Sequence, residues 1–314
     1  MVQLSAESLT QLVEKYISSL VVNRNEVRIY GDRNDGTIQF KPIAVKGQVE
    51  TSYFYGDSKP KNIIVISSQV GCPEKCKFCY LGDETFKGDL SAEEMYGQVV
   101  LMLKLAKDNG FDIDTINHKV TVANSGEPLL NKSLVQGLEK IAELGFSFKV
   151  STIFSAQAKA RKNFEAVANF AAEYNQPVQP QISLISTSEG YRAEMGRVAT
   201  FREIRDAADY WFGLNPLESG GRKINLSLIL SQNTPADVTD VLEVFPPELF
   251  RFRFRDYVET TVGKRHGLMT ITEKRMITIK QQFREAGYDV FDHATPTPIE
   301  KEHRLVANKT LLLG

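Results

Sequence analysis

The chain of 314 residues, 42% of them hydrophobic and 25% charged, has the composition of an ordinary globular protein and the length of one large α/β domain or two modest ones. Its formal net charge of −1 provides no overall positive field for nucleic acid or an anionic membrane, although a local basic patch would be enough for either. No apolar run reaches the ~18 residues of a spanning helix, the first residues do not resemble a signal peptide, and three clustered cysteines suit a reducing compartment, so we expect a cytoplasmic protein with no membrane partner.

The first 58 residues have a different pattern from the rest of the chain. Residues 6–22 place apolar side chains on one face and predict a short amphipathic helix. The stretch that follows alternates apolar and polar residues between Gly, Asn and Asp turns, which predicts a small hairpin-rich element. The polar segment 56–62 is the expected boundary, so we predict a small accessory element of helix and hairpins at 1–58.

From residue 59 the sequence repeats the order strand, loop, helix six times. The first strand is expected in "NIIVISSQV" and the sixth in "LFRFRFRDYVE". Ser91, with Glu94 three residues later, resembles the capping box that opens a helix. The helices are expected near 91–107, 132–144, 157–174, 200–213, 235–243 and 272–286. Such a series implies parallel strands with right-handed crossovers, so the predicted fold is α/β, a partial (βα)6 TIM-like barrel at 59–295 followed by a C-terminal tail at 296–314.

All three cysteines, Cys72, Cys76 and Cys79, lie within eight residues directly after the first predicted strand. In a barrel of parallel strands this position is on the face that carries the chemistry. Thiolates on one short loop are the usual ligands of iron–sulfur clusters, and three ligands on a four-iron cluster leave one iron open. The alternatives are three structural cysteines without a metal, or a zinc site with a histidine as fourth ligand. The candidate histidines are His118, His266, His293 and His303.

The pattern Cys-x3-Cys-x-aromatic-Cys after a first strand resembles the signature of the radical S-adenosylmethionine (SAM) superfamily. The wider stretch "SSQVGCPEKCKFCYLG", followed by "GEPLLN" at 126–131, resembles more narrowly the RlmN/Cfr-type adenine methyltransferases of ribosomal and transfer RNA. The resemblance covers about residues 61–290. It implies a [4Fe–4S] cluster on the three cysteines and SAM as cofactors, a one-electron reductant such as flavodoxin or ferredoxin as a partner, and reductive cleavage of SAM to a 5′-deoxyadenosyl radical.

The same resemblance implies which residues bind SAM. Gly126 and Glu127 match a Gly-Glu-Pro turn after the second strand, in which the glutamate accepts from the methionyl ammonium. Ser151 matches a serine near the SAM ribose or carboxylate, and Ser183 matches the first residue of a Ser-Leu-His run. In this chain Ile185 replaces that histidine, so only Ser183 and the backbone carry over.

A SAM-binding asparagine of the family lies near the end of the sixth strand, where Asp256 is the nearest polar residue of this chain. The loop "STSEGYRAEMGRVAT" resembles a family loop that carries an arginine, so Arg192 and Arg197 are candidates to bind the SAM carboxylate or the substrate. The alternative for both arginines is an ordinary solvated loop. Tyr80, Tyr191 and Tyr257 are conceivable hydrogen or electron relays, but tyrosines usually serve packing.

The sixth strand alternates Arg251, Arg253 and Arg255 with phenylalanines. Because side chains alternate along a strand, the arginines should share one face, and the phenylalanines should point outward onto helices. Three inward guanidinium groups need anionic partners, for which a SAM carboxylate, a substrate carboxylate or a phosphate are candidates. The alternative is salt bridges to acids such as Glu127 or Asp256, or a partly exposed edge strand.

Methyltransferases of the RlmN/Cfr type use two further cysteines, one as methyl carrier and one to resolve the covalent adduct. Both are missing here, because the three cysteines of the chain are all in the one loop. A serine or histidine cannot replace the soft sulfur that accepts the methyl group. We therefore expect a radical SAM enzyme that abstracts hydrogen from an unknown substrate, a small molecule, a nucleotide or RNA, without a methyl-cysteine step.

Two alternatives remain open at this point. An RNA-directed modifying enzyme related to the RlmN/Cfr type is supported by the arginine strand and by "GKRHG" at 263–267, but not by the net charge of −1. The second alternative is a non-catalytic regulator that binds the cluster or SAM. The presence of the cysteine, Gly-Glu-Pro and serine motifs together argues against this alternative.

Overall fold

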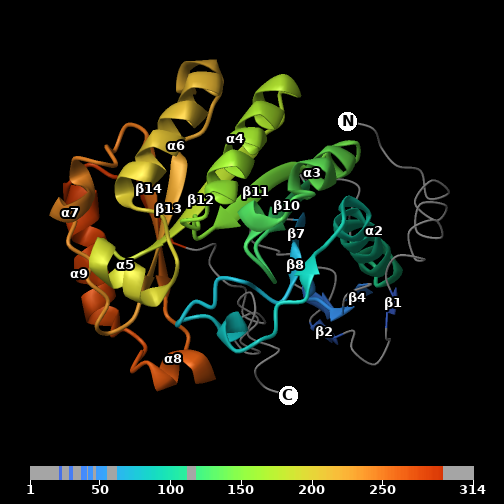
Figure 1. Ribbon diagram of the computed structural model, residues 1–314, viewed down its shortest axis with the longest axis horizontal. Helices are drawn as coiled ribbons and strands as arrows, with labels where there is room; N and C mark the ends of the chain where they lie inside the picture. The colour runs from blue at the N-terminus through green and yellow to red at the C-terminus, as the bar shows by residue number, and fades with distance from the viewer. Residues whose placement is uncertain are drawn as a thin grey trace. The chain divides into compact units, whose positions relative to one another are not determined.

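The computed structural model describes residues 21–22, 28–30, 37–40, 42–44, 47–54, 62–111 and 118–292 (Figure 1). The predicted helix over 6–20 and the predicted tail at 296–314 lie outside these residues. Val21–Val22, expected to end that helix, forms a strand instead, β1. The predicted boundaries near 58 and 295 also fall outside the described part and stay predictions.

The chain divides into two compact units. The first contains the residues up to Cys72 together with Thr85–Lys149. The second contains Pro73–Glu84 and Val150–Thr295, so the boundary between the units falls inside the cysteine loop. Strand β11, Ser147–Thr152, crosses the other boundary.

The first unit has a five-stranded sheet in the order β10–β7–β6–β3–β2, in which β10 is parallel to β7 and the other pairs are antiparallel. Its strands are β2 Arg28–Tyr30, β3 Thr37–Phe40, β6 Thr51–Phe54, β7 Asn62–Ile66 and β10 His118–Val122. Two small antiparallel sheets contain β1, β4 Pro42–Ala44 and β5 Gly47–Gln48, and β8 Gln69–Val70 with β9 Gly88–Asp89. The antiparallel strands confirm the hairpin-rich pattern expected before residue 55.

The helices of the first unit are α2 Ala92–Asp108, the short 3-10 helix η3 Pro128–Leu130 and α3 Leu134–Ala142. The predicted capping box at the start of α2 is confirmed, since the Ser91 hydroxyl accepts from Glu94 N–H and the Glu94 carboxylate accepts from Ser91 N–H. On α2, the buried Gln98 carboxamide accepts from Ser67 N–H and donates to Ser67 C=O, at 2.9 and 3.0 Å. These bonds hold the end of β7, from which the cysteine loop continues.

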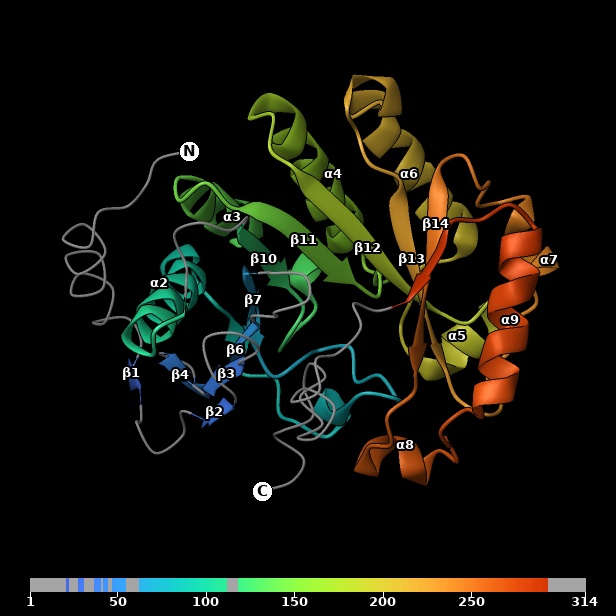
Figure 2. The same cartoon turned by 180° about the vertical axis from the view of Figure 1, so that it is seen from behind.

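The second unit has a parallel sheet in the order β12–β13–β14–β15. Its strands are β12 Val178–Ile185, β13 Ile224–Leu230, β14 Phe250–Asp256 and β15 Val290–Asp292. Its helices are η2 Tyr80–Gly82, α4 Ala158–Glu173, α5 Glu189–Met195, α6 Phe201–Leu214, η4 Leu217–Ser219, α7 Thr239–Leu242, α8 Thr261–Arg265 and α9 Glu273–Glu285. Figure 2 shows α4 and α6 side by side, and the two helices are in contact.

The predicted class, α/β with mostly parallel strands, is confirmed, because β7, β10, β11, β12, β13 and β14 are the six expected strands and a helix follows each. The helix predicted at 235–243 is shorter and covers Thr239–Leu242, and the Asp237 carboxylate accepts from Thr239 N–H in the turn before it. The short helices α5 and α8 were not predicted, because seven and five residues are too few to show a 3.6-residue period.

The alternation on β14 is confirmed. Phe252 and Phe254 are buried and pack on Phe283 of α9, with ring centroids 4.6 and 5.1 Å from the Phe283 centroid. Burying one phenylalanine contributes about 1.5–3 kcal/mol, so this aromatic cluster is a main reason why α9 lies on the strand. The arginines of β14 accordingly lie on the other face. Among the described residues, no helix is both long and apolar enough to cross a bilayer.

Candidate functional site

The cysteine loop contains the boundary between the two units. Cys72 is the last residue of its segment in the first unit, and Cys76 and Cys79 belong to the second. Cys72 and Cys76 are buried, Cys79 is half-buried, and none of them is in a disulfide. In the described part of the chain, no three His, Cys, Asp or Glu side chains are placed together so that they could hold a metal ion. The predicted ligand role of the three thiols therefore stays a prediction.

Two backbone positions give the loop its course. Gly71 has φ +71°, and a Cβ atom there would lie 2.4 Å from the Thr85 carbonyl oxygen, so only glycine fits. Lys75, between the first two cysteines, has φ +50°, and its ammonium group donates to the Glu84 carbonyl. The loop thus turns back on itself in a left-handed conformation that L-residues rarely adopt.

Glu74 holds the loop from inside, and the sequence reasoning missed it. Its side chain is 5% exposed, and one carboxylate oxygen accepts from Ser155 Oγ at 2.9 Å and from Gln157 Nε2 at 2.6 Å. The other oxygen is buried and, within the described residues, has no hydrogen-bond partner. The position between two cysteines was a signal, but nothing in the sequence pairs Glu74 with a serine 81 residues away.

The end of α5 holds Cys76. Lys77 N–H donates to the Met195 carbonyl at 2.9 Å, and a Cβ atom on Gly196 would lie 3.2 Å from Cys76 Sγ. The glycine therefore lets the chain pass directly beside the thiol, and a larger residue would displace one of the two.

Burial raises the pKa of the Cys79 thiol to about 11, and a hydrogen bond from the Leu81 backbone opposes this shift. The thiol is neutral at pH 7, so a metal that binds it as thiolate must release its proton. The chain on both sides of Cys79 is fastened to α8 and its N-cap: Thr260 Oγ1 donates to the Phe78 carbonyl at 3.5 Å, and Arg265 pairs with Asp83 at 2.5 Å.

In the first unit, Gly126 and Glu127 form a turn against the segment that leads into the cysteine loop. Gly126 has φ +104°, and a Cβ atom there would lie 2.6 Å from Gln69 Cβ and 2.8 Å from Ser68 Oγ. Glu127 is 3% exposed, its N–H donates to Gln69 Oε1 at 2.8 Å, and its carboxylate accepts from Leu129 N–H at 3.2 Å. The tight turn expected from Gly-Glu-Pro is confirmed, and its role toward SAM stays a prediction.

In the second unit, polar side chains follow one face of the parallel sheet. We call this the polar face, and its residues are Gln179, Gln181, Ser183, Asn225, Ser227, Arg251, Arg253 and Arg255. The register aligns Gln181 with Asn225 and Arg251, and Ser183 with Ser227 and Arg253. Ser151 of β11 joins this set, because Gln181 Nε2 donates to Ser151 Oγ at 3.3 Å. The structure therefore places Ser151 and Ser183 on the face that carries the three arginines.

The partners of the arginines are neutral amides. Arg251 donates to Asn225 Oδ1 at 2.5 Å and to Gln179 Oε1 at 2.6 Å, and Arg253 donates to Gln181 Oε1 at 3.0 Å. In the described part, neither arginine has an ion pair with a carboxylate, so the expected alternative of salt bridges to acids is wrong for these two.

The predicted Asp256 is the exposed last residue of β14, beyond the three arginines. Burial, followed by the positive charge of Arg251, lowers the pKa of Arg253 to about 10, and burial with Arg253 does the same for Arg255. All three guanidinium groups remain charged at neutral pH.

Arg192 and Arg197 have different surroundings. Arg192 is 1% exposed, donates to the carbonyls of Leu184 and Ala199 at 2.8 and 2.9 Å, and stacks on the Phe201 ring at 4.9 Å. These contacts give it a structural task in holding α5, whereas Arg197 is exposed. Of the tyrosines, Tyr257 is buried and its hydroxyl accepts from Thr260 N–H, which is a packing role.

Backbone strain occurs where strands of the second unit end. Ile185, the last residue of β12, has φ +70° beside a register shift after Ser183, and Phe154 after β11 has φ +55°. A β-branched residue in this region is an outlier, and such strain concentrates at functional sites. Ile185 also stands where the Ser-Leu-His run of the resembled RlmN/Cfr-type enzymes has its histidine.

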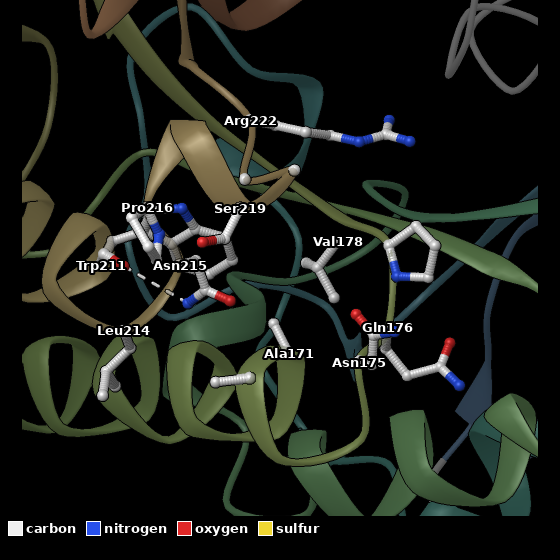
Figure 3. A pocket seen from close by; sticks show the side chains of 14 residues that line it. Ala171, Asn175, Gln176, Val178, Trp211, Leu214, Asn215, Pro216, Ser219 and Arg222 are labelled. Carbon is white, nitrogen blue, oxygen red and sulfur yellow. Dashed lines mark hydrogen bonds between the residues drawn. The ribbon is translucent and has the colours of Figure 1, made fainter.

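A separate cavity of about 360 Å³ lies between the C-terminal ends of α4 and α6 (Figure 3). The Asn215 carboxamide donates to the Trp211 carbonyl at 3.3 Å in its wall, and Arg222 lies at its edge. Because Val178 begins β12, the cavity is at the amino end of the strand, opposite to the end that carries Ser183 and Ile185.

No protein-family model matches the sequence. Among solved structures, the chain is similar to a radical SAM methyltransferase from Sphaerobacter thermophilus, with a TM-score of 0.71 and 20% identity over 88% of this chain and 77% of that one. It also matches Streptococcus suis SuiB bound to S-adenosylmethionine (TM-score 0.48, 17% identity, 79% of this chain and 53% of that one). A third match is TYW1 with a lysine-pyruvate adduct bound (TM-score 0.49, 14% identity, 71% and 73%).

At TM-scores below 0.5 the last two matches carry no argument. The first match covers most of both chains, and at 20% identity what it shows is a shared fold. The chain therefore has the α/β fold of a radical SAM enzyme.

Proposed function

We propose that the chain is a radical SAM enzyme that binds a [4Fe–4S] cluster on Cys72, Cys76 and Cys79 and cleaves S-adenosylmethionine reductively. The 5′-deoxyadenosyl radical then abstracts hydrogen from the substrate. The observation that carries the proposal is the Cys-x3-Cys-x2-Cys loop, placed after the first parallel strand of a fold shared with a radical SAM methyltransferase. The finer relation to RlmN/Cfr-type enzymes belongs to the same proposal.

The donor chemistry of the loop fits a cluster better than zinc. Three thiolate ligands on a four-iron cluster would leave one iron without a protein ligand, and a catalytic metal site requires such an open position. Among the four histidines, His266 is the one whose side chain the structure describes, and it is exposed after α8. It offers no fourth ligand to a closed zinc site.

The bound cluster with SAM would supply a one-electron cleavage of the sulfonium, and the chain's own residues would orient the cofactor. Glu127 can accept from the methionyl ammonium, because its backbone position is fixed by Gln69. Ser151, Ser183 and Asp256 are the further residues that we assign to SAM. An electron donor such as flavodoxin or ferredoxin is part of the proposal, and no methyl-cysteine step is, because all three thiols are in the cluster loop.

The RNA-directed alternative finds little support in the geometry. The basic residues of "GKRHG" are already paired, Lys264 with Glu259 at 3.1 Å and Arg265 with Asp83 at 2.5 Å. The arginines of β14 are half-buried rather than displayed on an open surface. Nucleic-acid binding generally uses exposed cations that can reach phosphates.

The test is anaerobic reconstitution with iron and sulfide, followed by incubation with SAM and dithionite. We expect 5′-deoxyadenosine, detected by liquid chromatography and mass spectrometry. The Cys76→Ala and Cys79→Ala variants should lose both cluster and product, while Arg161→Gln, on α4 and outside the cysteine loop, should retain both. A wild-type chain that holds its cluster but forms no 5′-deoxyadenosine contradicts the enzyme proposal and leaves the non-catalytic regulator.

A further inference from the structure

On the polar face, Arg251 and Arg253 carry positive charges that their described neighbours orient but do not neutralise. Arg251 and Arg253 are held by amide oxygens, and both guanidinium groups lie over the Phe291 ring, at 4.9 and 5.4 Å from its centroid. Amides and a ring fix the direction of a guanidinium group without cancelling its charge. The two arginine side chains are therefore held in place while their positive charges remain available to an anionic ligand.

The charges act on one another along the strand. Burial lowers the pKa of each arginine of β14, and a neighbouring positive charge lowers it further: Arg222 at Arg251, Arg251 at Arg253, and Arg253 at Arg255. Asp289 opposes this effect at Arg251, whereas the causes at Arg253 are burial and the charge of Arg251. Half-buried like charges repel strongly, and an oxyanion between them would relieve the repulsion.

Arg253 also has an unused donor. Its Nε is buried and, among the described residues, has no hydrogen-bond partner, although its NH1 donates to Gln181. A guanidinium group offers its donors as a planar fork that matches the oxygens of a phosphate or carboxylate. A buried donor without a partner costs free energy that such an oxygen would recover.

We infer that the polar face of the second unit binds an oxyanion of the substrate, a phosphate or carboxylate group, through Arg253 and the neighbouring Arg251. This inference rests on the proposed function, because it names the chemical class of the substrate that the proposed enzyme would act on. Arg251 and Arg253 are two residues apart on one face, about 6.6 Å at ~3.3 Å per residue, a spacing that the two phosphate groups of a diphosphate can span and the single carboxylate of SAM cannot. Ser227, in register with Arg253, supplies a hydroxyl on the same face.

The experiment is a calorimetric titration of the cluster-loaded protein with inorganic pyrophosphate, against sodium chloride at equal ionic strength. We expect saturable binding in the wild type and about tenfold or greater weakening in Arg253→Met. Arg161→Gln, which removes one half-buried arginine of an i,i+4 pair on α4, is the matched control and should bind like the wild type. Because Arg253→Met could lower stability, the thermal midpoint of the wild type is also measured, and pyrophosphate should raise it more than chloride does.

A second arm distinguishes the two sources of an oxyanion. With SAM at saturation, pyrophosphate binding should persist if the site binds the substrate. Competition between SAM and pyrophosphate would overturn the inference, because it would show that the arginines bind the SAM carboxylate. Pyrophosphate binding that is absent from the wild type, or equal in Arg253→Met, overturns it as well. The 5′-deoxyadenosine assay on the same preparations reports separately on the proposed function, so each can fail alone.

Discussion

At the scale of single residues, the candidate site depends on buried polar side chains that form hydrogen bonds with distant segments of the chain. Glu74 is the clearest case, because its carboxylate accepts two hydrogen bonds from residues 155 and 157 and lies between two of the three cysteines. Each hydrogen bond to a buried charged group contributes about 1.5–3 kcal/mol, and its loss leaves both donors unsatisfied. The fixed course of the cysteine loop therefore depends on a residue that is not a metal ligand.

We expect Glu74→Ala to lower the free energy of unfolding by about 2–3 kcal/mol and to reduce the iron retained after reconstitution, because Ser155 and Gln157 lose their acceptor. Glu74→Gln keeps one acceptor oxygen and should be milder in both measurements. Glu84→Ala, an exposed glutamate of the same loop, is the control and should change neither. Equal iron content in Glu74→Ala and Glu84→Ala would show that Glu74 does not position the loop.

Tyr288 gives a residue-scale prediction on pH. Its hydroxyl donates to the Phe245 carbonyl at 2.6 Å, and burial together with Glu248 raises its pKa well above the ordinary 10.0. The unfolded phenol ionises first as pH rises, so the stabilisation is complete below about pH 10 and is lost above it. Tyr288→Phe should cost about 1 kcal/mol at neutral pH and should lose less stability than the wild type between pH ~9 and ~11, measured by urea unfolding. Parallel alkaline curves for both proteins would contradict this.

At the scale of elements, the turns after strands are determined by close approaches that only glycine permits. Gly126 joins β10 to η3 in a left-handed conformation, with Gln69 and Ser68 where a side chain would be. Gly110, after α2, is also left-handed at φ +78°, but nothing lies within 4 Å of its Cβ position. A comparison of substitutions at Gly110 and Gly126 therefore distinguishes the cost of the backbone conformation from the cost of a steric clash.

Gly110→Ala should therefore cost about 1 kcal/mol, from the unfavourable φ alone. Gly126→Ala should cost clearly more, because its methyl group meets Gln69 Cβ at 2.6 Å and must displace the segment that leads into the cysteine loop. Denaturant midpoints of the two variants measure the difference. If Gly126→Ala is no less stable than Gly110→Ala, the turn can move away and does not fix that segment.

At the scale of the whole molecule, the proposed function predicts a linkage between cluster, SAM and stability. A ligand that binds only the folded state raises the unfolding free energy by about 2.7 kcal/mol at 100 times its Kd. We expect SAM to raise the thermal midpoint of the cluster-loaded protein and to leave the cluster-free protein almost unchanged, since the open iron would hold the cofactor. Stabilisation by SAM that is equal with and without the cluster would contradict the assignment of Cys72, Cys76 and Cys79.

The sequence by itself determined the α/β class, the six strands with their helices, the capping box at Ser91 and the two faces of β14. These follow from local periodicity, because a 2-residue or 3.6-residue repeat is set by neighbours along the chain. It also showed that one loop contains every thiol, which limits the chemistry available to these 314 residues.

Only the tertiary structure decided which distant groups meet. The pairing of Arg251 with Asn225 and Gln179 depends on the register of three strands. The hydrogen bonds of Glu74 to residues 155 and 157 depend on the position of a loop after β11. Arg192, expected on a solvated loop or at a ligand, turned out to be buried against the backbone. Such contacts arise from burial and hydrogen-bond satisfaction in three dimensions, and no periodicity along the chain encodes them.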